Sequence, residues 1–246
     1  MNNIAYCEDY RNRIYNYEDK EFDFAIVDPE YGINATKMNM GNAPNRNDDN
    51  GYPSTSTIKK LKGRLNSGGE KLKNRLLNQS EIDWDNEPAS PEYFKQLFRV
   101  SQHQIIFGGN YFDLPPTRCI ICWDKMQPWD NFSQWEMAWT SFDYPAKMYR
   151  VSNTGGANKE KKIHETQKPV KLYDLIYRDF VIPYMKNNPG KIVKVLDTHL
   201  GSGSHRITAY KTGVDFVGFE INPQKFADMQ KRYETFIMQN RVELTF

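Results

Sequence analysis

An acid, a proline and an aromatic residue follow directly after a short apolar segment near the N-terminus. Residues 22–27 predict a buried strand, and Asp28-Pro29-Glu30-Tyr31 comes immediately after it. Proline has no N–H to donate to a sheet, so the chain is expected to leave the sheet here. The Asp28 carboxylate and the Pro29 carbonyl are two acceptors beside the Tyr31 ring. This set suits a planar base with an exocyclic amine, on whose face the Tyr31 ring would stack. The alternative is an ordinary strand-to-loop connection in which Asp28 is solvated.

A second group of residues that could bind a ligand lies near the C-terminus. Residues 191–197 predict a strand, Gly201-Ser202-Gly203 a turn, and the next segment a helix that Ser204 is expected to cap. The strand predicted over 215–219 ends in Glu220, and Asn222-Pro223 is expected to cap a final helix. An acid at the tip of a second strand is placed to hold a ribose diol through two hydrogen bonds. This order predicts a nucleoside-binding site, with an ordinary tight turn as the alternative.

Other elements are predicted less directly and serve to position these two groups. Pro169 opens a helix that extends toward Tyr184 and is interrupted near Pro183. Proline and acid after Ser90 predict a capped helix that runs to Val100. Further strands are predicted over 104–107, 118–123 and 135–140.

Taken in order, the motifs resemble those of the amino-methyltransferases of DNA, in the circular order that places the catalytic motif first (the β class). Asp28-Pro29-Glu30-Tyr31 is similar to the Asp-Pro-Pro-Tyr motif of that family. His164-Glu165-Thr166-Gln167-Lys168-Pro169 is similar to the segment that covers the methionine part of the cofactor. Asp197-Thr198-His199-Leu200-Gly201-Ser202-Gly203 resembles the cofactor loop. Two positions depart from the pattern: Glu30 replaces the second proline, and His199 stands where an aromatic residue is usual.

The resemblance implies a Rossmann-like fold, with a mostly parallel twisted sheet, helices on both faces and a circularly permuted motif order. It implies site-specific transfer of a methyl group from S-adenosyl-L-methionine to adenine N6 of a flipped-out base in duplex DNA, as in restriction–modification systems. Asp28, Pro29 and Tyr31 are the catalytic candidates. The residues expected to hold the cofactor are Thr166, Gln167, Lys168, Asp197, His199, Gly201, Ser202, Gly203 and Glu220.

Three alternatives stay open at this point. Transfer to cytosine N4 uses the same acceptors, although an acid rather than a serine at the start of the motif favours adenine. RNA is an alternative substrate. A degenerate core that only binds nucleic acid is the third, and Glu30 and His199 are the residues that hint at it.

A basic segment is the main feature of the charge distribution. The chain has 246 residues and a net charge of +2, but residues 57–77 hold seven basic side chains and one acid. We expect this segment, within a polar insertion over 34–87, to contact the DNA backbone, while a solvated amphipathic helix is the alternative. Residues 124–162 are a second candidate for recognition. The seven basic residues are Lys59, Lys60, Lys62, Arg64, Lys71, Lys73 and Arg75.

Length and composition predict one methyltransferase domain over 1–246, since a chain of this size supports a single α/β core. The chain shows neither a long apolar run nor a signal segment, so a cytoplasmic protein without membrane contact is expected. Cys119 and Cys122 are interpreted as buried strand thiols, and no metal is expected. Duplex DNA is the expected partner, and a homodimer is an open alternative.

Overall fold

The computed structural model describes residues 2–33, 87–126, 133–153, 162–164 and 166–243. It divides into two units, one formed by Met1–Tyr31 with Pro88–Phe246 and the other by Gly32–Glu87. The second unit lies almost entirely outside the described residues, and so do the seven basic residues of segment 57–77. The account below concerns the first unit, and the expectation of one domain over the whole chain stays a prediction.

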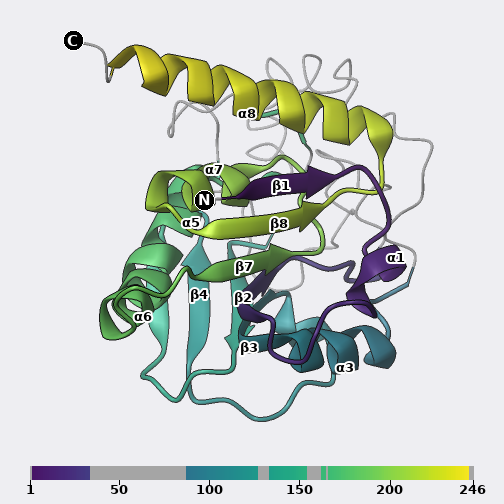
Figure 1. Ribbon diagram of the computed structural model, residues 1–246. Helices are drawn as coiled ribbons and strands as arrows, with labels where there is room; N and C mark the ends of the chain where they lie inside the picture. The colour runs from purple at the N-terminus through teal and green to yellow at the C-terminus, as the bar shows by residue number, and fades with distance from the viewer. Residues whose placement is uncertain (1, 34–86, 127–132, 154–161, 165, 244–246) are drawn as a thin grey trace, which may run out of the picture. The chain divides into compact units, whose positions relative to one another are not determined.

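The described residues form an eight-stranded sheet in the order β1-β8-β7-β2-β3-β5-β4-β6 (Figure 1). Within it, β5 runs antiparallel to β3 and β4, and the other neighbouring pairs are parallel. The strands are β1 (Asn3–Tyr6), β2 (Phe22–Val27), β3 (Ser101–Phe107), β4 (Ile120–Asp124), β5 (Trp135–Thr140), β6 (Lys147–Arg150), β7 (Lys194–Asp197) and β8 (Asp215–Phe219).

Helices pack against both faces of this sheet, each face with its own apolar core. One core includes side chains of α1 (Arg11–Ile14) and α3 (Pro91–Val100). The other includes side chains of α5 (Val170–Ile176), the π-helical segment η4 (Tyr177–Val181), α7 (Ser204–Thr212) and α8 (Pro223–Glu243). The other helices of the described residues are the 3₁₀ turn η3 (Gly109–Tyr111) and α6 (Ile182–Asn187). The expected Rossmann-like fold is confirmed.

Strand β2 lies between β7 and β3, and all six of its residues are buried. A strand covered on both faces needs apolar side chains throughout, which explains why the sequence is almost continuously apolar rather than alternating. Strand β7 begins at Lys194, three residues later than predicted, because residues 191–193 carry no ladder pairing. Strands β1 and β6 were not predicted. Both lie at an edge of the sheet and have only four residues each.

Two of the three predicted helix caps are confirmed. Ser90 Oγ accepts from the Tyr93 amide at 3.2 Å, and Asn222 Oδ1 accepts from the Gln224 amide at 3.0 Å. The cap assigned to Ser204 is wrong. Gly203, in the left-handed conformation at φ +73°, precedes the helix, and Ser204 is its first residue. The backbone turn itself therefore begins α7, as glycine permits.

The helix predicted from Pro169 is interrupted, as expected, but by a π-helical segment at Tyr177–Val181 rather than by a kink at the proline itself. Pro183 lies in the first turn of α6, where its missing N–H costs little. Cys119 is buried directly before β4, and Cys122 lies half-buried within it, where burial raises the pKa of its thiol. Within the described ranges, none of the helices is both long and apolar enough to cross a bilayer.

Candidate active site

The two groups of residues singled out in the sequence lie at the same edge of the sheet. Strands β2, β7 and β8 are neighbours and run parallel, so their carboxyl ends, with Asp28, Asp197 and Glu220, point to one side. From β2 the chain continues to β3 on one flank, and from β7 it continues to β8 on the other. Ligands of open α/β sheets bind at such a switch point.

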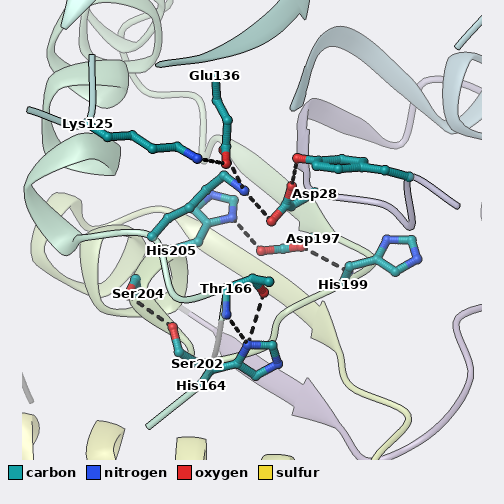
Figure 2. Close-up of polar contacts among 12 residues, drawn as sticks. Asp28, Lys125, Glu136, His164, Thr166, Asp197, His199, Ser202, Ser204 and His205 are labelled. Atoms are coloured by element: carbon teal, nitrogen blue, oxygen red, sulfur yellow. Dashed lines mark hydrogen bonds and ion pairs between the residues drawn. The ribbon is translucent and has the colours of Figure 1, made fainter. Parts of the chain in front are cut away.

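The Asp28 carboxylate is held by two side chains. Tyr31 donates its phenolic hydrogen to Oδ1, and the Lys168 ammonium pairs with Oδ2 (Figure 2). The Lys168 side chain is only 5% exposed, so this is a buried ion pair. Burial and the charge of Asp28 raise the pKa of Tyr31 well above its usual range, which keeps the phenol a donor. The carboxylate is thus fixed before any substrate arrives.

The ion pair continues into the sheet through two further charged residues. Lys168 Nζ lies 3.4 Å from Glu136 Oε2, and Lys125 Nζ lies 2.5 Å from Glu136 Oε1 (Figure 2). Burial alone would lower the pKa of Lys168, but the charges of Asp28 and Glu136 outweigh it and raise that pKa. Burial would likewise raise the pKa of Glu136, yet the two ammonium groups lower it. Two cations and two carboxylates therefore stabilise one another.

Lys168 makes a contact that the sequence analysis did not predict, because its ammonium pairs with the proposed catalytic carboxylate. Its expected place over the methionine part of the cofactor stays a prediction. The sequence analysis also missed Glu136. The sequence does contain a signal for Glu136: it is the one charged residue in the mostly apolar strand Trp135–Thr140, and a charge in such a strand needs a partner.

Tyr31 lies against neighbours that constrain its ring. The Tyr111 ring stacks on it, with centroids 4.8 Å apart and planes at 14°. A Cβ at Gly108, which has φ +69°, would lie 2.2 Å from Tyr31 Cε1, so only glycine fits there. The expected stacking of Tyr31 on a base stays a prediction. A base that entered on the covered face would displace Tyr111, whose side chain is 40% exposed.

The two glycines of the cofactor loop have different roles. At Gly203, a Cβ would lie 2.5 Å from Met229 Cγ of α8, so this glycine allows two helices to approach closely. At Gly201, the described residues that a Cβ would meet are limited to the His164 ring, at 3.8 Å. The described part of the chain therefore packs less tightly against Gly201 than against Gly203. The same distance shows that the segment around His164 lies next to this loop, as the resemblance implies.

Glu220 has the geometry expected of a ribose-binding acid. Its oxygens accept from the backbone amides of Gly201 at 3.0 Å and Asn222 at 2.8 Å. Burial raises the pKa of Glu220. A carboxylate has about four lone-pair sites that can accept hydrogen bonds. Among the described residues, these two amides occupy one such site on each oxygen of Glu220. The expected role of this buried acid toward a ribose diol stays a prediction.

Asp197 is buried and already occupied on both oxygens. It accepts from the His199 amide at 3.0 Å and lies 2.8 Å from His205 Nδ1 (Figure 2). His205 was not singled out in the sequence, although its place two residues after Gly203 put it on the helix that begins at this loop. Asp197 therefore shapes the loop.

The other predicted cofactor residues surround the same region. The Thr166 amide and hydroxyl contact His164 Nδ1 at 3.2 and 3.1 Å (Figure 2), and Gln167 Oε1 accepts from the Ile163 amide at 2.9 Å. Ser202 Oγ lies 3.2 Å from Ser204 Oγ. These contacts fix the walls of the site. Their roles toward a cofactor stay predictions.

Fold and site together define an α/β protein with a ligand site at the switch point of a doubly wound sheet. A family model described as DNA methylase, of the N6/N4 methyltransferase family, matches residues 36–231, and the chain belongs to this family. It is therefore a DNA methyltransferase of the N6/N4 type. The matched range includes the cofactor loop and Glu220 and begins after Tyr31.

Solved structures share the fold at low sequence identity. The PvuII DNA methyltransferase, which is cytosine-N4-specific, is 12% identical with a TM-score of 0.50, over 96% of this chain and 90% of that chain. M1.HpyAVI in complex with SAM is 16% identical with a TM-score of 0.47, over 93% and 98%. A DNA modification methylase from Thermus thermophilus, complexed with S-adenosyl-L-methionine and described as putative, is 12% identical with a TM-score of 0.46, over 95% of each. No curated protein sequence matches the chain.

Proposed function

We propose that this protein transfers a methyl group from S-adenosyl-L-methionine to adenine N6 of a base flipped out of duplex DNA. The observation that carries the proposal is the Asp28 carboxylate, held by Lys168 and Tyr31 at the same sheet edge as the hydrogen-bonded pair of Glu220 and Gly201. Family membership supplies the reaction class, and the acid that begins the motif favours adenine.

The chemistry requires alignment more than a strong base. An adenine amine is a poor nucleophile because its lone pair is delocalised into the ring. Asp28 and the Pro29 carbonyl accept hydrogen bonds from its two N–H groups. These bonds orient the nitrogen lone pair toward the methyl group. S-adenosyl-L-methionine, when bound, supplies that methyl group as a sulfonium. The amine then loses a proton, and Asp28 and water are the acceptors at hand.

Mass spectrometry of nucleosides tests the target atom. DNA from cells that express the protein is digested and compared with DNA from cells that express the Asp28→Ala variant. We expect N6-methyladenine only with the wild-type protein. N4-methylcytosine in its place would assign the alternative target, and the same modification in RNA alone would exclude DNA as the substrate. Sequencing of the methylated DNA then gives the recognition site.

Glu220→Ala is expected to weaken binding of S-adenosyl-L-methionine by about 1–3 kcal/mol, because the ribose hydroxyls lose a charged acceptor. Isothermal titration calorimetry measures the effect. Glu234→Ala is the matched control, since Glu234 is an exposed acid of α8. Equal affinity of a folded Glu220→Ala protein and the wild type would remove Glu220 from the site. Absence of binding to the wild type would favour the degenerate nucleic-acid-binding alternative.

Segment 57–77 is expected to bind the DNA backbone. Replacement of Lys59, Lys60, Lys62 and Arg64 by glutamine should weaken binding to every sequence alike. It should also reduce the slope of log affinity against log salt by about 0.9 for each lost phosphate contact. Specificity should change little, because phosphate contacts position while base contacts specify.

Fluorescence anisotropy with a DNA duplex at several salt concentrations measures this slope. The matched control replaces four exposed lysines of the first unit by glutamine: Lys95, Lys186, Lys211 and Lys231. A slope in the segment variant equal to that of the wild type would show that the segment is a solvated face, and residues 124–162 would then be the region to test.

A further inference from the structure

The two positions that depart from the family pattern contact each other. Glu30 follows β2 in the catalytic loop Asp28–Tyr31, and His199 follows β7 in the cofactor loop Asp197–Gly203. His199 Nε2 lies 3.1 Å from Glu30 Oε2. The side chains are 15% and 29% exposed. The glutamate in place of proline and the histidine in place of an aromatic residue thus contact each other in the folded protein.

The His199 imidazole is fixed by further contacts. Its Nδ1 lies 2.9 Å from Thr198 Oγ1, which in turn lies 2.6 Å from the Tyr93 hydroxyl. The rings of Tyr10 and Tyr93 pack against it, with centroids 5.1 and 5.5 Å away. The contact with Glu30 is within ion-pair distance but is not aligned as a hydrogen bond. It therefore acts mainly through charge.

The electrostatic surroundings favour the charged forms of both groups. Burial alone would raise the pKa of Glu30, but the positive charge of His199 outweighs it and lowers that pKa to about 2. Burial alone would lower the pKa of His199, but Glu30 outweighs it and raises the pKa above the ordinary 6.5. Within the described part of the chain, the other charged or titratable groups that act on the pair are Asp9, Asp28, Asp197, Glu220, Tyr10, Tyr93 and Arg11.

We infer that Glu30 and His199 are positioning residues for methyl transfer: their ion pair holds the catalytic loop at a fixed place against the cofactor loop. Glu30 lies between Pro29 and Tyr31, and His199 lies two residues before Gly201. The pair thereby links the acceptors of the target amine to the loop that faces the cofactor. A displacement of about 1 Å between reacting groups can cost about 100-fold in rate. The inference rests on the proposed function.

The pair has a defined pH window. His199 has a raised pKa in the folded protein, so its contribution is complete below about 6.5 and is lost as the pH rises through the folded value. Glu30 has a lowered pKa, so its contribution is complete above 4.5 and is lost as the pH falls toward about 2. Between these limits the loops stay joined. The link should therefore weaken on the alkaline side.

Steady-state kinetics with Glu30→Gln, His199→Gln and the double variant test the inference. We expect each single variant to lower kcat about ten-fold, with a smaller change in the affinity for S-adenosyl-L-methionine. The double variant should be no slower than the worse single variant, because both changes break the same contact. The double variant should also lose the alkaline fall in kcat that His199 causes in the wild type. Lys211→Gln, which breaks the ion pair with Asp174 between α7 and α5, is the matched control.

Single variants with the wild-type kcat would overturn the inference. So would decreases in kcat that are additive in the double variant. NMR titration of the four histidine rings gives a readout independent of activity. The His199 signal, assigned by its absence in His199→Gln, should titrate above 6.5 in the wild type and at lower pH in Glu30→Gln. A His199 titration that is the same in Glu30→Gln as in the wild type would contradict the ion pair, even if the enzyme is active. The expected shift in a protein that methylates no DNA would support the pair and refute the proposed function.

Discussion

Replacing Asp28 by alanine is expected to abolish methyl transfer and to leave the affinity for S-adenosyl-L-methionine nearly unchanged. The carboxylate is proposed to hold the target amine, whereas the proposed nucleoside site consists of Glu220 and the loop at Gly201, which are joined by a hydrogen bond. After the substitution Lys168 keeps Glu136 as its partner, at 3.4 Å, which limits the structural cost. Transfer of labelled methyl groups to DNA and calorimetric titration of the cofactor measure the two properties separately.

Two further variants make this experiment specific. Asp28→Asn keeps an acceptor oxygen without the charge, so we expect residual transfer above that of the alanine variant. Asp174→Asn removes a carboxylate that pairs with Lys211 away from the site, and it should transfer methyl groups as the wild type does. If Asp28→Ala transferred at the wild-type rate, Asp28-Pro29-Glu30-Tyr31 would not be the catalytic motif.

Lys168→Met should lower kcat by about 100- to 1,000-fold, the range typical for loss of one preorganised charged or hydrogen-bonding group in an active site. Lys168 is the buried cation between Asp28 and Glu136, and without it the two carboxylates lose their shared counter-ion, although Asp28 keeps the Tyr31 hydroxyl and Glu136 keeps Lys125. Removal of one partner of a buried pair also costs about 3–5 kcal/mol of folding free energy. Urea unfolding measures that loss, and rapid-mixing kinetics with saturating substrates measures kcat.

Lys125→Met is the matched control for this prediction. Lys125 contacts Glu136 at the far end of the same network and does not reach Asp28 in the structure. It should therefore reduce stability but lower kcat much less than Lys168→Met. Lys168→Arg keeps the charge and should retain more activity than the methionine variant. Equal kcat for Lys168→Met and the wild type would assign Lys168 a purely structural role.

Local sequence was sufficient to predict several elements, because their causes lie within a few residues. Residues 22–27 are continuously apolar and Pro29 ends the strand, so β2 and its exit were predictable. Ser90 and Asn222 each accept from amides two or three residues further on, which is why these caps could be predicted. The cap at Ser204 failed because Gly203 takes a left-handed conformation that begins the helix one residue earlier.

The sequence by itself determined the class of fold and the order of the motifs, because a strand and the turn that follows it are specified within a few residues. The residues proposed for the site stay predictions. Only the tertiary structure decided which side chains meet. Lys168 pairs with Asp28 across 140 residues of sequence. His199 meets Glu30 because the sheet places β7 beside β2. Such pairings depend on strand order and on the burial of charges that then require partners. A local pattern contains neither.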